Sequence, residues 1–229
     1  MKVQRKRVGQ LRSARRTLIE QTRIRQSFER RLSIQLLQFF EENGRIASTE
    51  YSDGRIRLLS LENRLSQILL PHYREIIIQM NERFTFTKQE TDFEAFVRKF
   101  IATLGGLRIT QISATTRRII NRIILLSELE GFGVAETASR IIEQTKPAFT
   151  RARAKLIART ETHQAASFAN QSIAESFNLP MKKRWISTND NRTRNHHRNM
   201  NGVTVDLDED FKVEYKGQIY PMQHAGDPR

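Results

Sequence analysis

The chain has 229 residues, a formal net charge of +14 and no cysteine. Without cysteine, neither a disulfide framework nor a thiolate metal site can form within these residues, and no apolar run reaches the ~20 residues that span a bilayer. A hydrophobic share of 38% and a charged share of 28% favour an elongated helical protein with a limited core over a compact enzyme. We therefore expect no membrane partner.

The positive charge is concentrated in particular segments. Residues 1–31 carry eleven Lys and Arg against two Glu, whereas residues 203–215 carry five acidic residues against Lys212 alone. Such clustering predicts a polyanionic partner, and double-stranded DNA bound through its phosphates without sequence preference is the commonest one. The alternative is that these arginines only solvate helix surfaces. The expected DNA-binding residues are Lys2, Arg5, Lys6, Arg7, Arg12, Arg15 and Arg16.

The N-terminal part of the chain is predicted to be helical. The first nine residues are expected to form a mobile basic arm. Apolar residues at three- and four-residue steps then predict a helix over 11–42. Asn43 and Gly44 are expected to end this helix, because both accept the left-handed conformation of a helix C-cap. A second helix is predicted to begin near residues 52–53, and Pro71 is expected to kink it or to start a new one.

Two more helices follow in the pattern. Thr91 and Glu94 have the spacing of a capping box, which predicts a helix start, and Gly105 with Gly106 predicts its end. Isoleucines and leucines over 109–129 then repeat with a helical period, and their stripe is wide. A stripe of that width predicts burial against more than one neighbouring helix.

The character of the sequence changes after Gly131 and Gly133, which predict a hinge. A short helix over 134–144 and a long helix over 148–177 are expected next, and Pro180 closes the long helix. Strands are predicted over 182–188 and 203–205, and a hairpin over 212–220 is predicted to turn at Lys216 and Gly217. The chain is therefore predicted to be mainly α. An elongated helical N-terminal region at 1–130 precedes a small α+β C-terminal module at 131–229.

The densest group of polar residues lies between residues 184 and 211. It reads Asp190-x-Arg192-Thr193-Arg194-x-x-His197, followed by Gly202 and an acidic loop that ends in Phe211. Further pieces precede and follow it in order: Gly133-Val-Ala-Glu-Thr-Ala138, Arg159-Thr160-Glu161, Asn170, Lys183-Arg184-Trp185, Tyr220-Pro221 and Gly226-Asp227-Pro228. In this order and spacing the pieces, which cover about 131–229, resemble the Mu F-like family of phage head morphogenesis proteins.

The resemblance implies a minor head protein, present in few copies, and no catalytic activity. Its implied partners are the portal protein and the capsid interior. Its implied location is the virion, inside the head near the portal, with the host cytoplasm as the place of assembly. Family members usually continue into a Cys-x-Cys ending, shortly after the point where this sequence stops at Arg229. Residues 1–130 resemble no family that we can name.

The polar group can be interpreted in three ways. A buried Arg–Asp network, with Asp190 capping a short helix at 192–200 and Trp185 packed on the long helix with Phe168 and Ile173, would hold a small module together. The residues of this structural cluster are Arg159, Glu161, Trp185, Asp190, Arg192, Arg194 and His197. Because Arg159 and Glu161 lie two apart on a helix, they face different ways, and only one of them is expected to join the cluster.

The other two interpretations involve a metal. A metal-dependent His-motif nuclease would use His196 and His197 as base and ligand. A zinc site would use His197 and Asp227, and we expect no cofactor unless Cys ligands follow Arg229. A basic regulatory DNA-binding protein fits the charge, but no helix-turn-helix pattern with a short Gly turn is evident.

Overall fold

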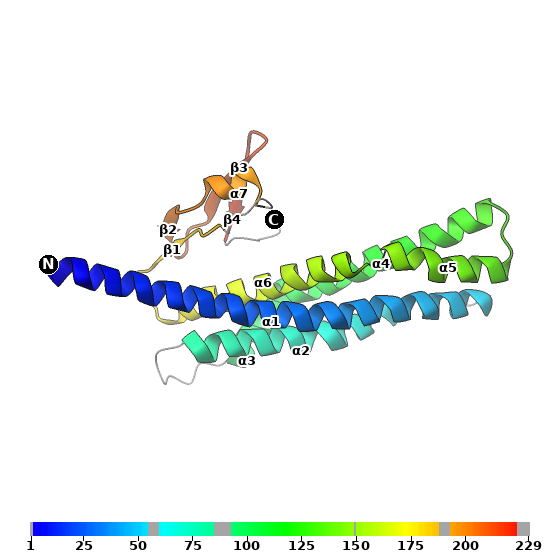
Figure 1. The fold of residues 1–229 in the computed structure, drawn as a ribbon, viewed down its shortest axis with the longest axis horizontal. Helices are drawn as coiled ribbons and strands as arrows, with labels where there is room; N and C mark the ends of the chain where they lie inside the picture. Colours follow the sequence, from blue (N-terminus) through cyan, green and yellow to red (C-terminus); the bar gives the residue numbers. More distant parts are fainter. Residues whose placement is uncertain (1, 55–59, 85–92, 149, 188–192, 224–229) are drawn as a thin grey trace.

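The computed structural model describes residues 2–54, 60–84, 93–148, 150–187 and 193–223. Long helices form a bundle, and a small module of strands and one short helix lies beside it (Figure 1). The helices of the bundle are α1 (Lys2–Ser52), α2 (Leu61–Phe84), α3 (Phe93–Phe100), the π-helical segment η1 (Ile101–Gly105), α4 (Gly106–Leu129), α5 (Val134–Ala148) and α6 (Arg151–Ser176). The module comprises β1 (Lys182–Arg184), α7 (Asn195–Asn199), β2 (Thr204–Asp206), β3 (Phe211–Tyr215) and β4 (Gln218–Met222).

This architecture confirms the predicted fold class, a mainly α chain with a small C-terminal module that contains strands. Among the described helices, none has a stretch that is both long and apolar enough to cross a membrane.

Helix α1 is longer than predicted and carries much of the core. It begins at Lys2, so the expected basic arm is helical in the structure, and it continues through Asn43 and Gly44 to Ser52. Asn43 does not cap the helix; its side-chain amide is buried and donates to the Phe39 carbonyl oxygen at 2.6 Å. A Cβ atom on Gly44 would lie 2.6 Å from the Thr145 hydroxyl, so this glycine lets α1 and α5 approach closely.

Helix α2 also departs from the expected pattern at its ends. It begins at Leu61 rather than near residues 52–53. It continues through Pro71, so of the two alternatives at this proline, a kink or a new helix, the new helix is wrong. The predicted apolar positions are buried, among them Leu65, Ile76 and Met80. The capping-box residue Thr91 lies outside the described residues, and Glu94 falls in the first turn of α3.

The glycine pair at 105–106 joins two helices instead of ending one. The chain passes from α3 through η1 directly into α4. A Cβ atom on Gly105 would lie 3.0 Å from the Tyr73 ring, so a close approach to α2 accounts for this glycine. The wide stripe on α4 is buried only over its first part, because Leu125, Leu126 and Leu129 are exposed near its C-terminus. The expectation that this whole stripe is buried is wrong at that end.

The C-terminal helices share the core of the N-terminal ones. Gly131, with φ of +78°, follows α4, and α5 extends to Ala148 rather than ending near residue 144. The Thr150 side chain caps α6 by accepting a hydrogen bond from the Arg153 amide at 3.2 Å. Helices α5 and α6 pack against α1, and the buried residues of all these helices form one hydrophobic cluster. The expected division near residue 131 stays a prediction.

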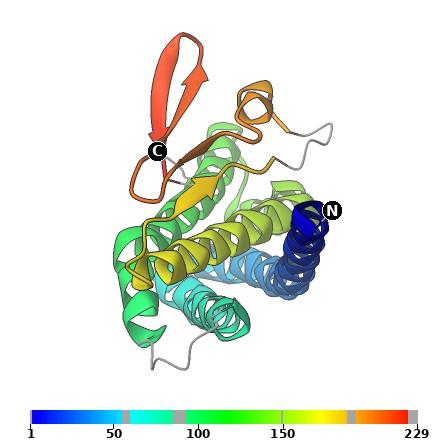
Figure 2. The ribbon, with the colours of Figure 1, turned by 90° about the vertical axis from the view of Figure 1, so that its left-hand side faces the viewer.

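The module has two small antiparallel sheets and its own core. Strand β1 pairs with β2, and β3 pairs with β4 in a hairpin whose turn residues Lys216 and Gly217 both have positive φ. These angles are those of a type I′ turn, and the predicted hairpin is confirmed. Strand β1 is shorter than predicted, and β2 has the predicted length but begins one residue later. The module lies beside the N-terminal half of α1, above α6 (Figures 1 and 2).

His72 in α2 is a buried group with an incomplete set of hydrogen bonds. Its side chain is 4% exposed, and Nε2 lies 3.0 Å from the Thr162 hydroxyl on α6. Within the described part of the chain, Nδ1 has no hydrogen-bond partner. Burial, with a smaller contribution from the positive charge of Arg31, lowers the pKa of His72 from 6.5 to about 4. The folded bundle therefore holds a neutral imidazole.

Acid should destabilise the bundle through His72. Between pH 6.5 and 4, His72 is protonated in the unfolded chain but not in the folded chain. The free energy of unfolding therefore falls as the pH falls across this window. The loss is about 3 kcal/mol, at 1.36 kcal/mol for each pKa unit. In His72→Gln this loss should disappear, as measured by urea unfolding at pH 7 and pH 4.

The comparison needs a control, because burial raises the pKa of Glu161 and acts in the opposite sense. The quantity to measure is therefore the difference between His72→Gln and the unsubstituted protein, with His196→Gln in α7 as the matched histidine substitution. An equal decrease in the free energy of unfolding between pH 7 and pH 4 in all three proteins would contradict the assignment to His72.

Candidate functional site

Glu161 lies inside the bundle, away from the polar group of the module. It is 3% exposed on α6, and it accepts a hydrogen bond from the Tyr73 hydroxyl on α2 at 2.9 Å. Burial raises the pKa of Glu161, while the Tyr73 hydrogen bond and the charge of Arg108 lower it in part. This carboxyl group therefore joins α6 to α2 in the core.

Arg159 faces the surface on the other side of α6, as its spacing from Glu161 predicts. Its side chain is 55% exposed, and its Nε lies 3.8 Å from the Glu29 carboxylate on α1. An ion pair of this exposure adds at most about 1 kcal/mol. The structure does not bring Arg159 or Glu161 to Trp185, His197 or Arg194, which belong to the module.

Trp185 forms the centre of the module. It is 2% exposed, its ring stacks on His197 at 5.5 Å between centroids, and Phe211 meets it edge-on at 5.2 Å. Val213 and Met222 complete the small core. The prediction that Trp185 is a core residue is confirmed, but its partners are these module residues. Phe168, which was expected beside it, instead packs 5.2 Å from Phe100 in the bundle.

Hydrogen bonds fix α7, which carries His197, and the turn after it against the residues that follow β1. The Trp185 indole Nε1 donates to the Ser187 hydroxyl at 3.2 Å, and that hydroxyl donates to the His197 carbonyl oxygen at 2.5 Å. The Ser187 amide donates to the Asn201 side chain at 3.0 Å. Burial, His196 and Arg194 all lower the pKa of His197. This histidine therefore packs as a largely neutral ring on Trp185.

Helix α7 is shorter than the helix predicted over 192–200. Arg194 occupies its N-cap position, and no side chain caps it there. Asp190 and Arg192 lie outside the described residues, so the expected Arg–Asp network and the capping by Asp190 stay predictions. The same holds for the zinc site, because Asp227 lies outside the described residues as well. Within the part of the chain that is described, no three His, Asp or Glu residues gather in a way that would hold a metal ion.

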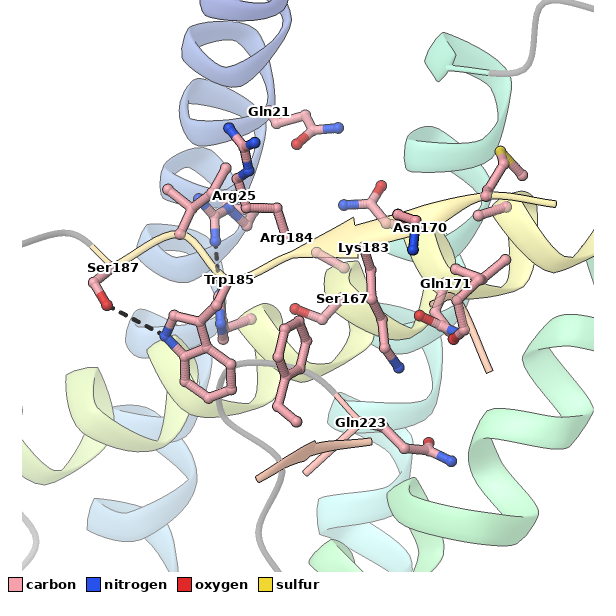
Figure 3. Close-up of a pocket in the computed structure, with 18 of the residues that line it drawn as sticks. Gln21, Arg25, Ser167, Asn170, Gln171, Lys183, Arg184, Trp185, Ser187 and Gln223 are labelled. Carbon is pink, nitrogen blue, oxygen red and sulfur yellow. Dashed lines mark hydrogen bonds between the residues drawn. The ribbon is translucent and has the colours of Figure 1, made fainter. Parts of the chain in front are cut away.

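A cleft of about 560 Å³ separates the module from the bundle. Figure 3 shows Gln21 and Arg25 reaching it from α1, and Ser167, Asn170 and Gln171 reaching it from α6. The segment from Met181 to Ser187 forms the opposite side. Carboxamide, hydroxyl and cationic groups thus converge on this cleft, and the described residues that line it include no Asp or Glu.

Arg25 is the main charge on the bundle side of the cleft. Its Nη1 donates to His163 Nδ1 at 2.7 Å, and its Nη2 donates to the Thr22 hydroxyl at 3.4 Å. Burial lowers the pKa of Arg25, and the negative charge of Glu29 partly offsets this. The sequence pattern did not predict a site at Arg25. The signal that could have identified it is its position within the apolar stripe over 11–42, since a charged residue on a buried face needs a partner.

The different roles of Glu161 and Arg159 can be tested by stability. Glu161→Ala should leave the Tyr73 hydroxyl unpaired in the core and lower the free energy of unfolding by about 2 kcal/mol or more. Arg159→Ala, two residues away on the same helix, should change it by less than about 0.5 kcal/mol. Urea unfolding monitored by circular dichroism measures both. A larger loss for Arg159→Ala than for Glu161→Ala would contradict this placement.

Comparison with known proteins gives a consistent result for the C-terminal half. Residues 120–225 match the family model described as phage Mu protein F like protein. The chain is 33% identical over 91 residues to the minor head protein GP7 of Bacillus phage SPP1, which is 39% of this chain and 29% of that protein. It is also 34% identical over 93 residues to an NAD(+)–arginine ADP-ribosyltransferase of Enterococcus faecalis, which is 39% of this chain and 19% of that protein.

The matched segment thus spans less than a third of either relative. No solved structure matches the chain significantly. The segment begins within α4, contains α5, α6 and the whole module, and includes both Glu161 and Trp185. The family model and the minor head protein thus support the resemblance to the Mu F-like family of phage minor head proteins for residues 120–225 of this chain.

Proposed function

We propose that the protein acts in phage head morphogenesis at the portal and the inner face of the capsid, and that it contacts double-stranded DNA without sequence preference. The observation that carries the proposal is the family segment at 120–225, supported by the match to a protein named as a minor head protein. The proposed location is the virion, inside the head near the portal, after assembly in the host cytoplasm. The proposed partners are the portal protein, the capsid interior and DNA.

The shape of the bundle supports contacts with two partners. The basic N-terminal end of α1 and the turn between α4 and α5 lie at opposite ends of the elongated bundle (Figure 1). Five large apolar side chains are exposed around that turn: Leu125, Leu126, Leu129, Phe132 and Val134. Exposed apolar side chains that gather at one end of a protein are typical of a protein–protein interface. We assign this apolar tip to the contact with the head shell or portal, and the basic end to DNA.

We propose no catalytic activity. The ADP-ribosyltransferase name belongs to a whole protein of which the matched segment is only 19%, so the name carries no argument for an activity of this chain. The His196 ring lies 4.5 Å from the Tyr215 ring, and the His197 ring stacks on Trp185. Packing of both rings in the module supports a structural role for the pair over the role of base and ligand in a nuclease.

DNA contact by the N-terminal end can be tested with matched arginine pairs. Each phosphate contact contributes about 0.9 to the slope of log affinity against log salt. Arg12→Gln/Arg16→Gln should therefore lower the slope by about 1.8 and weaken binding of unrelated duplexes alike, as measured by fluorescence anisotropy. Arg118→Gln/Arg122→Gln removes the same charge at the same helical spacing from α4, and it should leave the slope unchanged.

Substitution is the appropriate change here, because a deletion through residue 31 would also remove Ile24 and Phe28 from the core. Equal effects of the two arginine pairs, or a strong preference for one duplex sequence, would contradict the proposal.

The apolar tip can be tested by incorporation into particles. Leu129→Gln/Val134→Gln should reduce the amount of protein that sediments with assembled heads by about tenfold or more, since losing 1.4 kcal/mol of binding corresponds to a factor of ten. The control is Ile34→Gln/Leu107→Gln, which changes two apolar side chains of similar exposure elsewhere on the bundle, 59% and 56% against 74% and 54%. Normal incorporation of the tip variant would show that another surface makes the contact.

A further inference from the structure

One edge of strand β1 has no hydrogen-bond partners among the described residues. The Trp185 amide donates to the Val203 carbonyl oxygen at 2.8 Å, and the Leu207 amide donates to the Met181 carbonyl oxygen at 2.9 Å. Because antiparallel pairing alternates along a strand, the backbone groups of odd-numbered residues in this segment face β2. The amide and carbonyl groups of Lys182, Arg184 and Ile186 therefore point to the outer edge.

The outer edge is open within the described parts of the chain. The register of β1 and β2 leaves the backbone groups of Lys182, Arg184 and Ile186 on that edge, and no described backbone hydrogen bond outside the strands involves them. The Ile186 side chain is 57% exposed. From residue 182 to residue 186 this edge extends roughly 17 Å, at about 3.3 Å per residue. Unpaired backbone groups of this kind are a template for another strand.

The edge borders the cleft between the module and the bundle (Figure 3). Opposite it, Gln21 and Asn170 present carboxamides, which can both donate to and accept from a peptide backbone. The Arg25 guanidinium donates to His163 and Thr22, and the negative charge of Glu29 acts on it from the same helix. The cleft thus offers backbone pairing on one wall, and polar side chains with the positive charge of Arg25 on the other.

The positive charge of the side chains that line the cleft indicates which kind of strand would bind there. Lys182, Lys183, Arg184 and Arg25 all line it, whereas the described lining residues include no Asp or Glu. Lys182 also donates to Asp206 at 2.7 Å. A second copy of the same strand would bring like charges together, which is unfavourable. A strand that carries carboxylates would complement the cleft.

We propose that the cleft binds an extended, acidic peptide segment of another head protein, which adds as a strand to the outer edge of β1. Main-chain hydrogen bonds to Lys182, Arg184 and Ile186 would give affinity, as in other cases of strand addition. Arg25 and Arg184 would favour carboxylates at alternate positions of the segment. The inference rests on the proposed function only for the source of the segment, because binding of a free peptide can be measured without heads.

The test uses the full chain and three labelled ten-residue peptides that alternate Val with Glu, Gln or Lys. The Glu peptide should bind best and the Lys peptide worst. On binding of the Glu peptide, amide exchange at Arg184 and Ile186 should slow by about tenfold or more, as measured by nuclear magnetic resonance, because 1.4 kcal/mol of protection corresponds to a factor of ten.

Two variants, each with a matched control, distinguish backbone pairing at the edge of β1 from simple attraction between charges. Ile186→Pro removes an outward N–H that β2 does not use, and proline is tolerated at such edge positions, so peptide affinity should fall by about tenfold or more while the module stays folded. Ile186→Val keeps the N–H and should bind as the unsubstituted protein does. Arg25→Gln should weaken the Glu peptide more than the Gln peptide, whereas Arg30→Gln, at an exposed position of α1, should affect neither.

The proposal is overturned if the Glu peptide fails to bind, or if it binds Ile186→Pro and Ile186→Val equally with no change in amide exchange. Protection of the same amides by a short single-stranded DNA in place of the peptide would also overturn it. Normal incorporation of Ile186→Pro into heads would leave the proposed function standing, so the two proposals fail by different measurements.

Discussion

The close packing of α6 against α1 and α2 is the constraint on which the other features of the molecule depend. The face of α6 that contacts these two helices consists largely of small residues: Ala154, Ala158, Ala165, Ala166 and Ala169 are all buried. Short side chains allow helix backbones to approach, so van der Waals contacts form along the whole length of the helices. The family segment therefore does not bury its central helix alone. Helices from the first half of the chain, outside that segment, cover it.

Dependence on the bundle continues into the module. A two-stranded hairpin is marginally stable by itself, and the module has two such sheets with a core built on Trp185, Phe211, Val213 and Met222. Its first strand follows α6 after a short connection, and the Gln171 side chain of α6 donates to the Leu207 carbonyl oxygen at 3.0 Å. The bundle thus holds one edge of the module beside Arg25 and Asn170, and the cleft exists because of that placement.

The two halves of the chain contribute different physical properties. The first half supplies the basic end of α1 and the large apolar residues of the core, such as Phe28, Leu36 and Tyr73. The second half supplies the alanine face of α6 and the aromatic packing around Trp185. The elongated shape keeps the basic end and the apolar tip apart, so these two surfaces are free to make separate contacts, and the module lies beside the N-terminal half of α1.

Local signals in the sequence were sufficient for the helical character, for the turn at Lys216 and Gly217, and for the burial of Trp185, because periodicity and turn chemistry act over a few residues. The residues predicted to end helices did not do so at Asn43 and at Gly105, because contacts with a neighbouring helix account for these residues instead. The polar pairs that organise the bundle were not predictable: Tyr73 and Glu161 are 88 residues apart, and Arg25 and His163 are 138 apart. The sequence alone thus determined which residues favour helix, strand or turn, whereas only the tertiary structure decided which polar groups are buried together, because that depends on contacts between distant segments.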